Sequence, residues 1–90
     1  MKITYDPAKR TKTINERGLD FEDAAEAFSG PTLTAPDQRH DYTEERFITF
    51  GVLHGREVIL VWTPRGDTRR IISMRYANER EIDRFQSKMD

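Results

Sequence analysis

The sequence predicts an α+β fold in which helices pack on a small antiparallel sheet. Residues 46–76 contain three consecutive runs rich in Val, Ile, Phe, Thr and Trp, which is typical of β-strands. Short turn segments separate these runs, as in an antiparallel meander. Apolar residues recur at helical spacing on both sides of the meander, which predicts the helices that cover it.

The three predicted strands are RFITFGVL (46–53), REVILVWT (56–63) and RRIISMRY (69–76). His54-Gly55 forms a two-residue hairpin turn, and residues 63–67 form the second turn, in which Pro64 presets the backbone. Residues 58–62 are apolar without alternation, which predicts a central strand with both faces covered.

Strict alternation along the third strand predicts two faces with different side chains. One face is expected to carry Arg69, Ile71, Ser73 and Arg75, and the other Arg70, Ile72, Met74 and Tyr76.

The remaining elements follow from cap residues and spacing. Residues 2–5 are a candidate N-terminal edge strand, and Asp6-Pro7 begins a helix that ends near Gly18. A second helix begins at Asp20 and buries one apolar face, and Ser29-Gly30-Pro31 ends it. Residues 32–45 are irregular and polar, with a short extended piece at 32–34. A capping box of Asn78 and Glu81 opens the last helix. The predicted order is β-α-α-β-β-β-α, in a single domain over residues 1–90.

Composition excludes several classes of site. The 90 residues include no cysteine, so we expect no disulfide and no thiol chemistry. Two histidines are too few for a metal site made of histidines alone, while carboxylates could still bind a hard cation. We expect no resident metal and no cofactor. No apolar run approaches the roughly 20 residues that span a bilayer, and the start lacks the apolar core of a signal peptide. We expect a cytoplasmic protein without membrane contact.

The net charge of −1 is unevenly distributed. Residues 20–45 carry 1 basic and 8 acidic side chains, and both flanking segments are net basic. Basic patches attract phosphate backbones, so nucleic-acid binding is one interpretation. The alternative is that the acidic segment folds onto the basic ones and neutralises them.

Arginine is the most plentiful chemical resource of the chain. The strands and their turns carry Arg46, Arg65, Arg69, Arg70 and Arg75. The planar arginine fork suits phosphate and stabilises the extra charge of a phosphoryl-transfer transition state. Its pKa, above about 12, makes it a poor general base.

RNA cleavage therefore needs another group to accept a proton from the 2′-hydroxyl. The candidates are His40, Glu57 and one of Glu44 or Glu45. Tyr42 or Tyr76 is a candidate for stacking on a base, and Lys12 and Arg69 are candidate RNA contacts.

Several ordered motifs resemble the BrnT family of toxins over roughly residues 3–85. They are DPAK, Asn15 with Gly18, FEDAAEAF, the D-x-R-x-D-Y-x-E-E-R-F-I-T-F-G stretch from Asp37, and TPRGDTRRIISMRYA. The resemblance implies a RelE-like fold and a cytoplasmic ribonuclease toxin of a bacterial type II toxin–antitoxin system. Such toxins cut RNA and inhibit translation. A BrnA-type antitoxin neutralises them in a hetero-oligomer, and the complex binds operator DNA through the antitoxin and represses its own operon.

By motif match, the resemblance assigns Arg46, Arg70 and Arg75 to the active site, with Arg65 and His40 as weaker additions. Where the family has Lys-His before the helix-ending glycine, this chain has Glu16-Arg17. This departure leaves open which residue is the acid–base group. The alternative is a non-catalytic module that binds RNA or a protein with the same basic face.

Overall fold

The computed structural model describes residues 1–39 and 43–89, which form a five-stranded sheet with helices. The elements in order are β1 (Lys2–Thr4), α1 (Pro7–Arg17), a 3-10 turn (Phe21–Asp23), α2 (Ala24–Ser29), β2 (Leu33–Pro36), β3 (Phe47–Leu53), β4 (Arg56–Arg65), β5 (Thr68–Tyr76) and α3 (Glu79–Met89). The α+β class is confirmed. The predicted order lacked one strand, because the extended piece expected at 32–34 overlaps a full strand, β2, that continues to Pro36.

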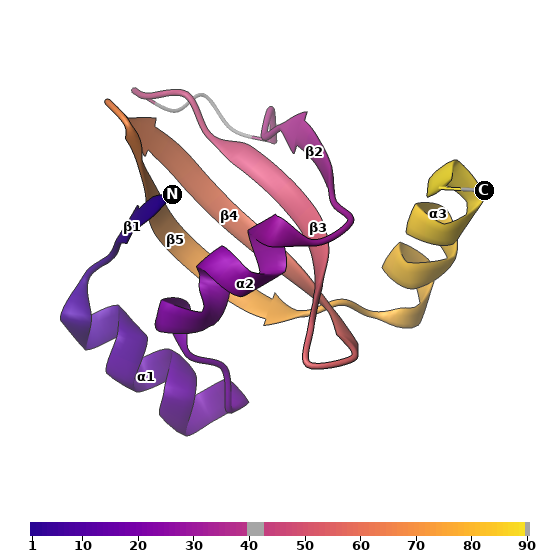
Figure 1. The fold of residues 1–90 in the computed structure, drawn as a ribbon, viewed down its shortest axis with the longest axis horizontal. Coiled ribbons are helices and arrows are strands. Elements are labelled where there is room, and N and C mark those ends of the chain that lie inside the picture. Colours follow the sequence, from indigo (N-terminus) through magenta and orange to yellow (C-terminus); the bar gives the residue numbers. More distant parts are fainter. Residues whose placement is uncertain (40–42, 90) are drawn as a thin grey trace.

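The strand order is β1-β5-β4-β3-β2 (Figure 1). Strands β2 to β5 pair antiparallel, and β1 pairs parallel with β5. The predicted edge strand and the central position of β4 are therefore confirmed. Residues 58–63 of β4 are all buried, because elements pack on both faces of that strand.

One face of the sheet holds the main hydrophobic core. The 3-10 turn and α2 cover this face (Figure 1), and Phe21, Ala24 and Ala27 are at most 1 % exposed. They pack against Val58, Leu60 and Trp62 of β4 and Ile71 and Met74 of β5. We call this side of the sheet the helical face.

The predicted caps are present. Asp6 accepts a hydrogen bond from the Ala8 amide at the start of α1, and Gly18 ends that helix with φ +69°. Asp20 accepts from the Glu22 amide at the 3-10 turn. Asn78 and Glu81 exchange hydrogen bonds of 2.8 and 2.9 Å between side chain and backbone, so the capping box of α3 is confirmed.

The second hairpin is tighter than predicted. Strand β4 continues through Pro64 and Arg65, and Gly66-Asp67 alone forms the turn. Pro64 is tolerated in the strand because β3 ends its pairing with β4 at Trp62, which leaves Pro64 on an edge. Gly66 supplies a φ of +61° that the two-residue turn requires.

A β-bulge overturns the predicted faces of β5. Val61 pairs with Ser73 and Trp62 pairs with Ile71, so Ile72 has no partner on β4. The extra residue shifts the alternation by one position. Arg69, Ile71 and Met74 therefore lie on the helical face. Arg70, Ser73 and Arg75 lie on the opposite side, which we call the open face.

Candidate nucleic-acid groove

A groove of about 480 Å³ lies between the open face and α3. Its floor is apolar and includes Ile48, Phe50, Ile59 and Val61. Phe85 of α3 stacks on Phe50 with ring centroids 3.8 Å apart and an interplanar angle of 13°. The polar side chains that line it are Ser73, four cations and one carboxylate: Arg39, Arg75, Arg84, Lys88 and Glu81. A positive, partly apolar groove suits a polyanion that also carries flat rings.

Arg75 enters the groove because of the bulge at Ile72. Arg75 pairs with Ile59 in the register of β4 and β5, and Ile59 is part of the groove floor. Without the extra residue, Arg75 would share a face with Ile71 and point into the core. The bulge thus directs one arginine of the strand into the groove.

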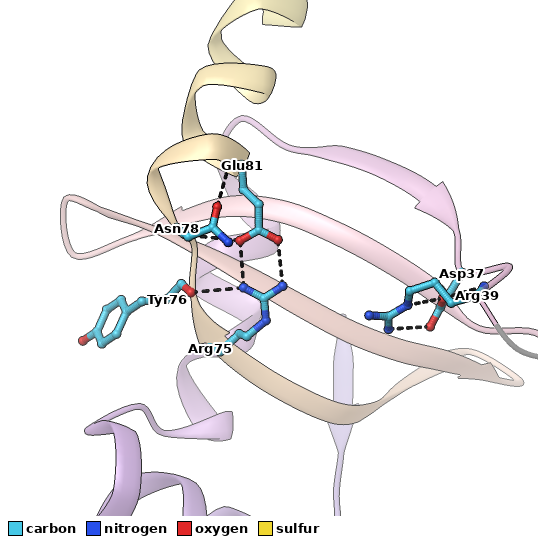
Figure 2. Close-up of polar contacts among 6 residues, drawn as sticks. All are labelled: Asp37, Arg39, Arg75, Tyr76, Asn78 and Glu81. Atoms are coloured by element: carbon cyan, nitrogen blue, oxygen red, sulfur yellow. Dashed lines mark hydrogen bonds and ion pairs between the residues drawn. The ribbon is translucent and has the colours of Figure 1, made fainter.

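Glu81 fixes the guanidinium of Arg75 (Figure 2). Nη1 of Arg75 donates to Oε1 of Glu81 at 2.8 Å, and Nη2 donates to Oε2 at 2.7 Å. Nη1 also donates to the carbonyl of Tyr76 at 3.3 Å. Because Glu81 is itself held by the Asn78 amide, the end of β5 and the start of α3 form one hydrogen-bonded unit.

The pair is strongly ionised. The hydrogen bonds from Arg75 lower the pKa of Glu81 to about 2, and those to Glu81 raise the pKa of Arg75. A carboxylate with so low a pKa holds a proton too weakly to act as a general base at neutral pH. Glu81 is therefore a positioning residue for Arg75.

Arg39 stands on the other side of the groove and is fixed in the same way. Its Nε and Nη2 donate to the two carboxylate oxygens of Asp37 at 2.8 and 2.9 Å. The Asp37 side chain is fully buried, and its backbone amide bonds to the carbonyl of Arg46. The Arg39 side chain is 59 % exposed, so a buried anchor holds an accessible cation. In Figure 2 the Arg39 guanidinium extends toward Arg75.

Arg46 and Arg70 lie level with one another on either side of β4, away from Arg75. Arg70 pairs with Thr63 of β4, and Arg46 directly precedes Phe47, which pairs with Trp62. Both arginines therefore lie at the level of Thr63. Arg75 lies at the level of Ile59, four residues and roughly 13 Å further along β4. The structure thus places two of the three arginines that the resemblance assigns at the same level on either side of β4, while the third lies in the groove.

The other predicted site residues lie elsewhere. Arg65 is half exposed and bonds to Glu44 at 2.9 Å. Arg69 lies on the helical face, 4.5 and 4.4 Å from the ring centroids of Phe28 and Trp62. Tyr76 is half-buried beneath Arg56, and Lys12 is exposed on α1. None of these four lines the groove.

A proton acceptor is missing from the described part of the groove. Within residues 1–39 and 43–89, its lining contains no histidine and no carboxylate besides Glu81. His54 contacts Glu26 of α2 at 3.0 Å, and Glu57 and Glu45 do not line the groove. His40 and Tyr42, two candidates from the sequence, lie outside the described residues.

Comparison with known protein families identifies the family of the chain. The model of the ribonuclease toxin BrnT of type II toxin–antitoxin systems matches residues 5–81. This chain belongs to the BrnT family. The match ends at Glu81, so it contains both arginine–carboxylate pairs of this BrnT chain. No match to a curated protein was found.

None of the helices in the described ranges is both long and apolar enough to cross a bilayer. In the same ranges, no three His, Cys, Asp or Glu side chains cluster closely enough to hold a metal ion.

Sequence reasoning missed the groove residues Arg39, Arg84 and Lys88, and the partners Asp37 and Glu81. The D-x-R spacing of residues 37–39 was a usable signal, because a short acidic residue two positions from an arginine can fix its fork. Glu81 was identified as a cap of α3. Its contact with Arg75, six positions earlier, depends on how the chain turns after β5.

Proposed function

We propose that this BrnT-family chain is a metal-independent endoribonuclease whose groove holds the RNA backbone. The observation that supports this most directly is Arg75, which is fixed by Glu81 and lines an otherwise cationic groove. A fixed guanidinium loses little side-chain entropy when it binds phosphate and needs no reorganisation as negative charge develops.

The proposed reaction is an intramolecular transesterification. The 2′-oxygen attacks the adjacent phosphorus while the bond from phosphorus to the 5′-oxygen breaks. The 2′-hydroxyl proton passes to a base, and the leaving 5′-oxygen takes up a proton. The products are a 2′,3′-cyclic phosphate and a 5′-hydroxyl. Arg75 stabilises the extra negative charge on the phosphoryl oxygens.

We assign the proton acceptor to His40 by residue type. It follows Arg39 directly in the chain, and an imidazole titrates near neutral pH. Arg46 and Arg70, together at the level of Thr63, are proposed to hold a second phosphate of the same strand. Arg65 and Arg69, with Tyr76 and Lys12, are left as outer RNA contacts.

Membership of the BrnT family supports a proposal for the biological setting. We propose that the toxin has a RelE-like fold, acts in the cytoplasm and inhibits translation by cutting RNA. We further propose that a BrnA-type antitoxin neutralises it in a hetero-oligomer, and that this complex represses its own operon through operator contacts of the antitoxin.

The second candidate is a module that binds RNA or a protein without cutting. One observation favours it: the described lining of the groove holds no competent general base. The same arginines would bind the partner in either case, so binding alone does not separate the two functions.

Product chemistry separates them. Purified protein is incubated with naked RNA in EDTA, and the 3′ ends of the fragments are analysed. We expect cyclic phosphate ends that disappear in Arg75→Ala and persist in Arg56→Ala, which removes an exposed arginine on the helical face. Circular dichroism is used to check that both variants are folded. Intact RNA with the folded wild-type protein, also in a translating extract, would favour the binding module.

A further inference from the structure

Arg75 has two edges, and Glu81 occupies only one of them. A guanidinium carries five N–H donors. The end-on fork of Nη1 and Nη2 donates to Glu81, and the remaining Nη1 hydrogen faces the Tyr76 carbonyl. No described residue accepts a hydrogen bond from Nε. The side-on fork, made of Nε and the second hydrogen of Nη2, is therefore available for a bidentate contact with an anion.

The open edge of Arg75 faces the other fixed arginine. Figure 2 shows Arg39 extending from its Asp37 anchor toward the Nε side of Arg75. Both side chains line the groove, and Arg39 is close enough for its charge to oppose protonation of Arg75. Two like charges held toward one another by separate carboxylates form a site that an anion between them would stabilise.

The chemistry of the site favours phosphate. Glu81 and Asp37 already neutralise one edge of each arginine, but Arg84 and Lys88 keep the groove lining net positive. A phosphate has oxygens in a tetrahedral arrangement, so it can accept from two guanidinium planes at once. The neighbouring apolar floor lowers the local polarity and strengthens such contacts.

We propose that Arg39 and Arg75 clamp a single phosphate group between them. The clamp assigns a binding role to Arg39, a residue outside the strands. That the phosphate belongs to an RNA strand rests on the proposed function. Free inorganic phosphate is the other source of the same chemistry, and the two arms below separate the sources.

The first arm uses inorganic phosphate and the wild-type protein. The ¹H–¹⁵N signals of the arginine Nε groups are followed during a phosphate titration. We expect the Arg75 signal to shift and saturate. The Arg10 signal serves as an internal control and should stay in place, because its Nε already donates to Asp20 at 2.7 Å. An unchanged Arg75 signal, or a larger response to acetate than to phosphate, would overturn the clamp.

The second arm uses an RNA oligonucleotide with 2′-O-methyl groups, which binds without being cut. Arg39→Ala and Arg75→Ala should each weaken binding about tenfold, the loss expected for one good charged contact. If both arginines hold one phosphate, the double variant should lose far less than the roughly hundredfold that independent contacts would give. Arg56→Ala is the matched control and should bind like wild type. A fully multiplicative double variant would contradict a shared phosphate.

The Arg39→Lys variant is a control for a possible loss of folding in Arg39→Ala. It keeps a cation beside buried Asp37 but replaces the planar fork with a point charge. We expect it to fold and to bind between wild type and Arg39→Ala. Binding equal to wild type in both Arg39 variants would remove Arg39 from the site.

The arms also separate failure of the clamp from failure of the proposed function. Saturable phosphate shifts in a protein that never cuts RNA would support the clamp and reject the ribonuclease. Efficient cleavage with unchanged binding in Arg39→Ala would support the ribonuclease and reject the clamp.

Discussion

At the scale of single residues, the groove depends on carboxylates that orient arginines. Asp37 and Glu81 each use both oxygens to fix one guanidinium. An exposed arginine on its own samples many rotamers and loses that freedom on binding. An arginine that is already fixed has lost most of its rotamer freedom during folding. Binding an anion then costs less side-chain entropy, and the guanidinium already has the orientation that binding requires.

The Arg75–Glu81 pair predicts a pH-dependent stability. The pKa of Glu81 is about 2 in the folded protein, against an ordinary value of 4.5. Its contribution to the free energy of unfolding is therefore fully present above about pH 5 and is lost as the pH falls toward 2. We expect Glu81→Gln to cost about 1–2 kcal/mol at pH 7, a figure reduced for solvent screening because Arg75 is 39 % exposed.

Urea unfolding at pH 7, 4 and 2.5 tests this prediction. The difference between wild type and Glu81→Gln should shrink steadily over that series. A difference that stays constant with pH would show that the ion pair does not contribute through the charge of Glu81.

At the scale of elements, the sequence predicted most of the strands and helices but not their relation to the groove. Caps such as Asp6, Gly18 and Asn78 have local signals, and the predicted helix boundaries follow them closely. The bulge in β5 has no such signal. Ile71 and Ile72 are both apolar, so the alternation of apolar and polar residues along β5 fits either register. Only the pairing with β4 decides which of the two is buried.

Helix α3 is held to the open face by few contacts in the part of the chain that the structure describes. The main ones are the stack of Phe85 on Phe50 and the ion pair of Glu81 with Arg75. We expect Phe85→Ala to release α3 while the sheet remains folded, because the main core lies on the helical face. Hydrogen exchange should then show faster exchange in 79–89 and unchanged protection in β4. Equal loss of protection in both would contradict this independence.

Helix α2 approaches β3 closely at Gly51. A Cβ placed there would lie 3.4 Å from the Ala27 carbonyl oxygen and from Cγ2 of Thr32. A methyl group fits at the limit of ordinary contact, but the branches of valine would push α2 away. We expect Gly51→Val to lower the free energy of unfolding by about 2 kcal/mol and Gly51→Ala by clearly less. Chemical denaturation measures both, and equal effects would show that α2 can shift without cost.

At the scale of the whole molecule, the two faces of the sheet have different roles. The helical face holds the main core, and the open face holds the groove. The acidic middle of the chain does neutralise part of the charge of the flanking basic segments, through Asp20 with Arg10 and Glu44 with Arg65. The groove stays cationic because Arg84 and Lys88 come from α3, beyond that acidic segment.

The groove cations should therefore dominate the salt dependence of RNA binding. We expect the double variant Arg84→Ala/Lys88→Ala to reduce the slope of log affinity against log salt by about 0.7 for each lost phosphate contact on single-stranded RNA. Lys9→Ala/Arg56→Ala removes the same charge from exposed residues outside the groove. The same loss of slope in both double variants would show that net charge matters and the groove does not.

The pairing of β1 with β5 has a consequence for how the chain folds during synthesis. Residues 2–4 pair with residues 68–70, so the first strand to leave the ribosome has no partner until β5 has followed it. Closing so long a loop is slow compared with forming a helix or a hairpin. Until then the edge of β4 that β5 will occupy stays bare, and Arg75 has not yet been made. The nascent toxin therefore carries no assembled groove while most of its sheet is still being translated.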